Sequence, residues 1–111
     1  MSTADETSAN LAHIVYFTLT DRSTEARDAL IAACREHLSG HEGEVYFSVG
    51  HLAEQYQRPV NDRDFDVALH VVFDSVKAHD AYQVAPRHLK FIEQNKPTWA
   101  KVRVFDSIIG A

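Results

Sequence analysis

Apolar and polar residues alternate in four stretches of the chain, and this period of two is typical of β-strands. The stretches cover residues 11–20, 45–53, 65–73 and 99–105. β-Branched and aromatic residues, which favour strands, are frequent in all four. Every second residue from Phe65 to Phe73 is apolar, so we expect one face of the third strand to pack against helices.

Apolar residues recur every three or four positions in segments between these strands, which predicts amphipathic helices. The first helix follows an N-cap at Ser23 and ends at Ser39-Gly40, where glycine can take the left-handed cap. A short helix carrying Tyr82 follows the Asp74-Ser75 turn. Another begins at Pro86, a residue tolerated in a first helical turn.

The predicted order β-α-β-β-α-β, with its second helical segment in two parts, is that of a ferredoxin-like α+β domain. Such a domain has a four-stranded antiparallel sheet with helices on one face. We expect one domain over residues 11–111, preceded by a polar, disordered tail over residues 1–10. The polar segment 54–64 is interpreted as a connecting loop rather than a lid.

The second face of the predicted sheet is also apolar. Burying about 300 Å² of it, at about 25 cal/mol per Å², is worth roughly 7 kcal/mol per subunit before association costs. Left in water, it would be a larger apolar patch than monomers usually expose. We therefore expect a homodimer with the two sheets face to face. The expected contact residues are Tyr16, His70, Val72 and Phe105, with Ile14 and Tyr46 nearby.

The composition argues against several classes of partner. With 11 basic and 16 acidic residues the net charge is −5, which disfavours nucleic acid. The chain has no run of about 20 apolar residues, so we expect no membrane span. The lone Cys34 reads as a small buried apolar residue and has no internal disulfide partner. The first ten residues do not resemble a secretory signal, and we expect a cytoplasmic protein.

Four segments are similar to those of a known family. They are HIVYFTLTD (13–21), FDVALHVVFDS (65–75), AYQVAPRHLKF (81–91) and KVRVFD (101–106). Together they resemble the stress-responsive A/B barrel (Dabb) family of dimeric α/β-barrel proteins, many of which have no assigned activity. The resemblance implies a ferredoxin-like subunit whose sheet closes into a barrel across a dimer.

The resemblance also implies a site. Plant members include a polyketide cyclase with a pocket between sheet and helices, served by two histidines and supporting tyrosines. The matching positions are His13, His88 and Tyr82, while Arg35 stands in place of a second tyrosine and Ala85 in place of another histidine. The residues expected to line the pocket are Val15, Phe17, Arg35, Leu69, Phe91 and Trp99.

The residues themselves leave two interpretations of the histidines open. His13 lies on the helix-facing side of its strand, where it must be hydrogen-bonded or line a cavity, and His88 is its expected partner. The two form either a structural pair or an acid/base pair assisted by Tyr82. Asp66 is expected to bond the backbone or His70 across the dimer.

The seven histidines show no ligand spacing such as HxH or HExxH, and nucleotide or flavin motifs are absent, so we predict neither metal nor cofactor. Two functional hypotheses follow. One is a homodimer that binds a small apolar ligand or acts as a structural stress protein. The other is a cyclase or lyase acting on a ketone-rich or aromatic small molecule. A solid core beside His13, Tyr82, His88 and Trp99 would oppose the enzyme, and a cavity of roughly 300 Å³ would favour it.

Overall fold

A computed structural model describes residues 9–110 and contains the predicted elements in the predicted order. The strands are β1 (Asn10–Leu19), β2 (Glu44–His51), β3 (Val67–Phe73) and β4 (Trp99–Ile109). The helices are α2 (Thr24–Leu38), α3 (Val76–Gln83) and α4 (Pro86–Asn95), followed by the 3₁₀ turn η1 (Lys96–Thr98). The predicted disordered tail falls mostly outside the described residues, and Asn10, which it included, is already the first residue of β1.

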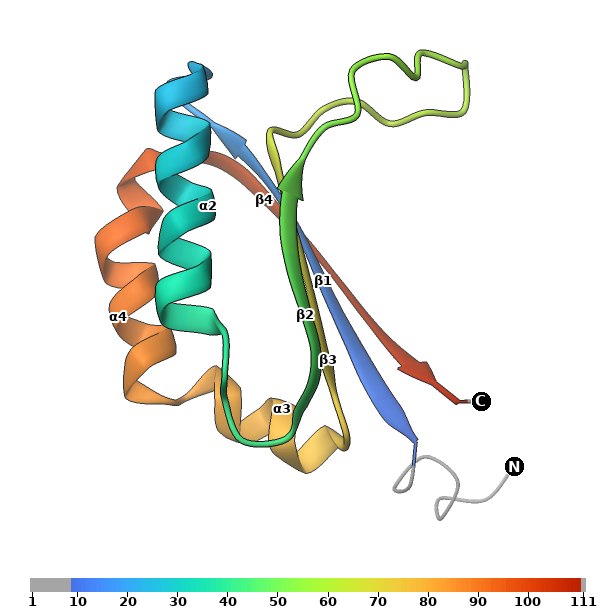
Figure 1. Ribbon diagram of the computed structural model, residues 1–111, viewed down its shortest axis with the longest axis vertical. Coiled ribbons are helices and arrows are strands. Elements are labelled where there is room, and N and C mark those ends of the chain that lie inside the picture. The colour runs from blue at the N-terminus through green and yellow to red at the C-terminus, as the bar shows by residue number, and fades with distance from the viewer. Residues whose placement is uncertain (1–8, 111) are drawn as a thin grey trace.

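The four strands form one antiparallel sheet in the order β2-β3-β1-β4. The three helices lie on one face, and no helix of the described chain covers the other (Figure 1). This is the expected ferredoxin-like fold. None of the helices in residues 9–110 is long and apolar enough to cross a membrane.

The alternation in the two central strands builds the core, as the sequence predicts. On β3, Val67, Leu69, Val71 and Phe73 are each at most 1% exposed. These side chains pack against buried residues of β1, α2, α3 and α4, among them Cys34. Burial raises the pKa of the Cys34 thiol to about 12, so this residue is an inert part of the core rather than a nucleophile.

The helix boundaries follow the predicted caps. The hydroxyl of Ser23 accepts a hydrogen bond from the Ala26 backbone N–H at 3.1 Å, and Ser75 makes the corresponding bond at the start of α3. Beyond α2, Gly40 has a φ of +76°, the left-handed conformation that glycine adopts without strain.

Three strand boundaries differ from the expectation by two residues or more. β2 ends at His51 rather than at residue 53. β3 begins at Val67 rather than at residue 65, although the Asp66 backbone N–H still donates to the Phe17 carbonyl at 2.7 Å. β4 extends to Ile109 rather than ending at residue 105. Its register pairs Ile109 with Asn10, so β4 continues as far as β1 offers backbone groups to pair with.

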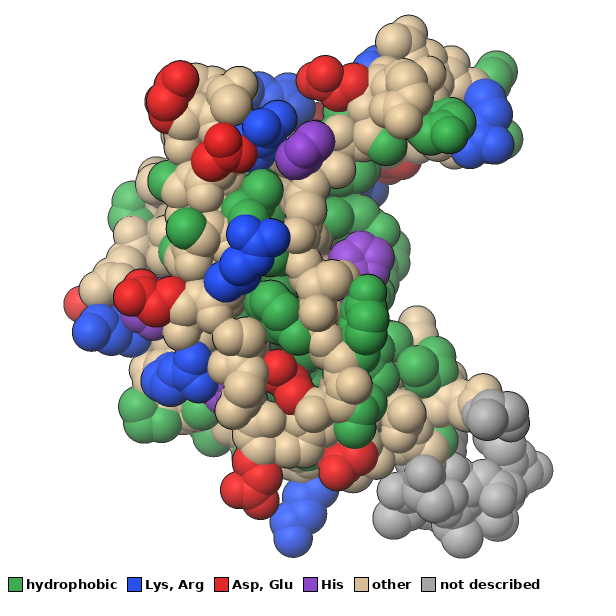
Figure 2. Space-filling model, viewed as in Figure 1, with side chains coloured by type: hydrophobic (Ala, Val, Ile, Leu, Met, Phe, Trp, Pro, Cys, Tyr) green, Lys and Arg blue, Asp and Glu red, His purple; other side chains and the backbone are tan. Residues whose placement is uncertain are grey.

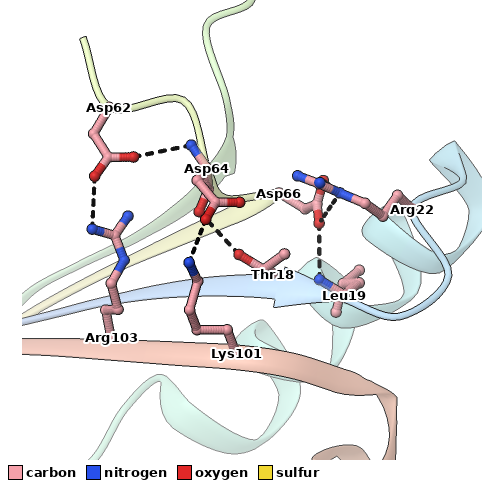
Figure 3. Close-up of polar contacts among 8 residues, drawn as sticks. All are labelled: Thr18, Leu19, Arg22, Asp62, Asp64, Asp66, Lys101 and Arg103. Carbon is pink, nitrogen blue, oxygen red and sulfur yellow. Dashed lines mark hydrogen bonds and ion pairs between the residues drawn. The ribbon is translucent and has the colours of Figure 1, made fainter. Parts of the chain in front are cut away.

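The loop between β2 and β3 (residues 52–66) projects from the sheet (Figure 1) and is tied down at its second end. The anchors are three alternate aspartates, drawn in Figure 3. Asp62 pairs with Arg103 at 2.8 Å, and Asp64 pairs with Lys101. Both pKa values are lowered, that of Asp62 chiefly by the Asp64 backbone N–H and that of Asp64 chiefly by the hydrogen bond from Lys101.

The third aspartate is the least exposed of the three. Asp66 accepts a hydrogen bond from the Leu19 backbone N–H at 2.8 Å and pairs with Arg22 at 3.1 Å (Figure 3). Asp66 was expected to bond either the backbone or His70 across the dimer, and in the structure it bonds the backbone.

The uncovered side of the sheet is called here the open face. Its central row places His70, Ile14 and Phe105 next to one another on β3, β1 and β4. Tyr16 packs edge-on against Phe105 at 5.9 Å between ring centroids. The β2–β3 loop rises beside this face and encloses a hollow of about 380 Å³, visible at the right of Figure 2.

Candidate functional site

A cavity of about 150 Å³ lies on the opposite side of the sheet, beneath the helices. The three expected site residues, His13, Tyr82 and His88, all line it. Five of the six expected pocket residues line it as well: Val15, Phe17, Leu69, Phe91 and Trp99. The remaining lining residues are Leu38, Gln83, Ile92, Val102 and Val104. The region is therefore not a solid core, although the cavity has half the volume that would favour an enzyme.

Arg35 was expected in this pocket, and that expectation is wrong. Its side chain is exposed and does not line the cavity. Helix α2 turns Cys34 and Leu38 toward the sheet, and each helical residue is rotated about 100° from the one before it. Position 35 therefore points away from the sheet, and Leu38 borders the cavity instead.

Two side chains that line the cavity each carry a buried polar group without a partner. The hydroxyl of Tyr82 and the indole N–H of Trp99 are buried and have no hydrogen bond to any residue from 9 to 110. Tyr82 is 2% exposed. Burial raises the pKa of its phenol well above the ordinary value, with smaller contributions from Glu44 and Cys34, so it stays a donor. An unpaired buried polar group costs about 1–3 kcal/mol, which an acceptor brought within hydrogen-bond distance would recover.

His13 belongs to a polar cluster at the edge of this cavity. Its Nδ1 lies 2.6 Å from Oδ1 of Asp106 and 3.3 Å from Nε2 of His79. The side-chain amide nitrogen of Gln83 lies 3.0 Å from that same nitrogen of His79. Burial lowers the pKa of His13 below its ordinary value, and its contact with Asp106 only partly offsets this. His13 is therefore a neutral imidazole at pH 7.

His88 is not the direct partner of His13, so the expected pairing is wrong. No hydrogen bond joins the two rings, and His88 Nδ1 instead donates to the Gln83 carbonyl at 3.1 Å. The ring of His88 packs on Tyr82 at 4.5 Å between centroids. Burial lowers the pKa of His88 below its ordinary value. Because Nδ1 is the donor, the neutral ring carries its lone pair on Nε2.

Sequence reasoning missed His79 and Asp106 as site residues. The β1–β4 register places Asp106 directly opposite His13, so a fourth strand extended past residue 105 would have revealed this neighbour. On α3, His79 precedes Tyr82 by three residues and Gln83 by four, which puts it on the same buried side of the helix. The helical spacing of His79 relative to Tyr82 was therefore the sequence signal that could have identified His79.

A family comparison fits this architecture. Residues 11–109 match the model of the stress responsive A/B barrel domain. The chain belongs to the Dabb family. A comparison with curated proteins returned no match.

Solved structures of similar fold include a Dabb family protein from Mesorhizobium loti, 20% identical over 93% of this chain and 99% of that chain, with a TM-score of 0.76. A dimeric ferredoxin-like protein of unknown function from Thermobifida fusca is 16% identical over 92% of both chains, with a TM-score of 0.74. A hydroxynitrile lyase from Passiflora edulis is 23% identical over 93% of this chain and 95% of that chain, also at 0.74. At these identities the likeness shows the fold alone.

Proposed function

We propose that this Dabb protein is a homodimer that binds a small, mainly apolar molecule in the cavity beneath its helices. The observation that carries the proposal is the pair of unpartnered donors, Tyr82 and Trp99, in an otherwise largely apolar wall. Apolar walls supply the affinity for such a ligand, and a few polar groups fix its orientation. The expected ligand therefore carries at least one hydrogen-bond acceptor.

The cavity volume sets the size of the ligand. A dry cavity of about 150 Å³ is large enough to hold benzene. Sites for drug-sized molecules start at about 300 Å³. We therefore expect a compound of one ring, or a short chain, with a carbonyl or similar oxygen.

The test compares two ligands of similar size, acetophenone and ethylbenzene, which carry a carbonyl group and a methylene group, respectively, next to the ring. We expect acetophenone to raise the melting temperature more than ethylbenzene does. In wild type, acetophenone should also bind more tightly than ethylbenzene. Tyr82→Phe should reduce this ratio of affinities by about 10-fold or less, which is the effect of losing one neutral hydrogen bond. Tyr56→Phe, at an exposed tyrosine of the β2–β3 loop, is the matched control. If neither compound binds, or both bind equally to wild type, the proposal is wrong.

A second candidate function is proton abstraction next to a carbonyl, as a cyclase or lyase requires. The observation that favours it is the orientation of His88. Its Nδ1 donates to a backbone carbonyl, so Nε2 keeps a lone pair with which it can act as a base, and the ring packs on that of Tyr82. In this reaction Nε2 takes the proton from the carbon, while the Tyr82 hydroxyl hydrogen-bonds to the carbonyl oxygen on which charge develops.

This candidate is tested by following exchange of the acetophenone methyl hydrogens in D₂O by NMR. An active site of this kind should accelerate exchange over buffer, and His88→Asn should abolish the acceleration. Asparagine keeps a donor for the Gln83 carbonyl but cannot take up a proton, so the variant separates basicity from structure. Exchange no faster than in buffer, with acetophenone bound, would leave binding as the function.

Two further parts of the proposal concern assembly and location. We infer that the dimer forms through the open face, and the description of the Thermobifida fusca protein as dimeric supports dimerisation as such. A cytoplasmic location remains a prediction from the sequence, and the buried thiol of Cys34 is compatible with it.

A further inference from the structure

We propose that His13, His79 and Asp106 form a binding site for a divalent transition-metal ion of the zinc class. The three residues come from β1, α3 and β4 and lie far apart in the sequence. Each offers one donor atom, and the three atoms lie within 4.8 Å of one another. The chain shows no local ligand motif, because the tertiary fold alone assembles this set.

The separations of the three donor atoms fit a tetrahedral ion. Nδ1 of His13 lies 3.3 Å from Nε2 of His79, and Nε2 of His79 lies 3.7 Å from Oδ1 of Asp106. Bonds of about 2.0–2.1 Å to a tetrahedral zinc ion put neighbouring donors about 3.4 Å apart. The third separation, 2.6 Å between His13 and Asp106, is that of a hydrogen bond. An ion would replace the shared hydrogen, and the neutral ring of His13 would carry its hydrogen on Nε2 instead.

The two imidazoles are already held in place. His13 is 4% exposed and His79 is 9% exposed, and their rings pack at 4.9 Å between centroids. Phe73 packs edge-on against His79 from the sheet side. Rigid donors lose little conformational entropy when an ion binds. The ligand set therefore needs no large rearrangement beyond a turn of the Gln83 amide away from His79 Nε2.

The third ligand provides access. The side chain of Asp106 is 41% exposed, so an ion can enter from solvent, and a fourth position would be left for water. Its carboxylate supplies a negative charge, which an imidazole ligand does not. Asp80 lies 3.7 Å from Nδ1 of His79, so a small side-chain movement would bring it into hydrogen-bond distance as an outer carboxylate that orients the ring.

The donor types select the class of ion. Two imidazole nitrogens and one carboxylate suit zinc, cobalt or nickel, whereas magnesium and calcium prefer oxygen ligands alone. With three protein ligands the site resembles zinc centres that keep an open position, rather than closed structural centres.

The experiment uses the full chain, freed of metal with a chelator and dialysed. It is titrated with zinc chloride by calorimetry and with cobalt chloride by visible absorption. We expect one ion per chain, with the intense absorption of four-coordinate cobalt. Paramagnetic broadening in NMR spectra should be strongest for the imidazole signals of His13 and His79. This test involves no organic ligand, so its failure leaves the proposed function intact.

Two variants and one control decide whether the cluster is the site. Asp106→Asn and His79→Gln should each weaken binding at least about 10-fold. Asp106→Asn keeps the shape of a part-exposed side chain, and circular dichroism checks that it folds. His51→Gln removes an exposed histidine on β2 and should change nothing. Absence of binding, or equal binding by all three variants, would overturn the proposal.

Discussion

At the scale of single residues, the buried imidazoles of His13 and His88 make the folding stability of the chain depend on pH. Burial lowers the pKa of both rings below the value of 6.5 that an exposed histidine has. In the unfolded chain the same residues take up protons near pH 6.5, so acid shifts the equilibrium toward unfolding. The contribution of these two histidines to the free energy of unfolding is therefore complete above about pH 6.5. It is lost as the pH drops through their folded-state pKa values.

The pH prediction at this scale concerns His88→Asn. Wild type should lose more stability than this variant between about pH 7.5 and pH 5, because the variant has one titrating group fewer. Asparagine can still donate to the Gln83 carbonyl, so both proteins should be folded at neutral pH. Urea unfolding in metal-free buffer measures the difference. Equal pH dependence in the two proteins would show that His88 keeps its ordinary pKa.

At the scale of elements, the aspartates of the β2–β3 loop contribute unequally to the stability of the fold. Asp66 accepts the Leu19 backbone N–H at the end of β1, in a part-buried position, and so joins β1 to the start of β3. Asp64 is more than half exposed and pairs with Lys101 in contact with solvent. Unpaired buried groups cost more than lost surface ion pairs. The junction at Asp66 is therefore the stronger anchor of the loop.

The corresponding prediction compares two alanine variants. Asp66→Ala should destabilise the chain by about 1–3 kcal/mol, because the Leu19 N–H loses its acceptor. Asp64→Ala is the matched control and should cost at most about 1 kcal/mol. Chemical denaturation of both variants gives the comparison. A cost for Asp64→Ala equal to or above that of Asp66→Ala would contradict this ranking.

At the scale of the whole molecule, the unpaired surface is the open face. Phe105 is 49% exposed and Tyr46 is 55% exposed, and both belong to the apolar side of the sheet that the helices leave uncovered. An apolar surface of this kind gains from pairing with its own copy about a twofold axis. The β2–β3 loop rises beside this face, so a partner would also contact the loop (Figure 1).

Light scattering at micromolar concentration tests the assembly. Wild type should have the mass of two chains, and Phe105→Glu should shift it toward one, because a carboxylate would be buried between the sheets. Leu89→Glu changes a similarly exposed leucine on α4, on the helical side of the sheet, and should leave the dimer intact. A monomeric wild type would refute the dimer.

Local spacing was sufficient to predict much of the fold and part of the site. Alternation placed His13, Val15 and Phe17 on the helix-facing side of β1, and short-range signals located the caps at Ser23 and Ser75. These features depend on residues within one helical turn or two strand positions of each other. Interactions over so short a distance along the chain can be predicted from the sequence alone.

The polar cluster of the site depends on tertiary structure. Asp106 meets His13 because β4 continues in register along β1, and His79 joins them through the rotation of α3 on the sheet. The exposure of Arg35 results from the rotation of α2 in the same way. Strand register and helix rotation are set by packing of the whole core, which sums many small contacts between distant segments. No window of sequence contains those contacts, so only the folded chain shows which polar groups meet.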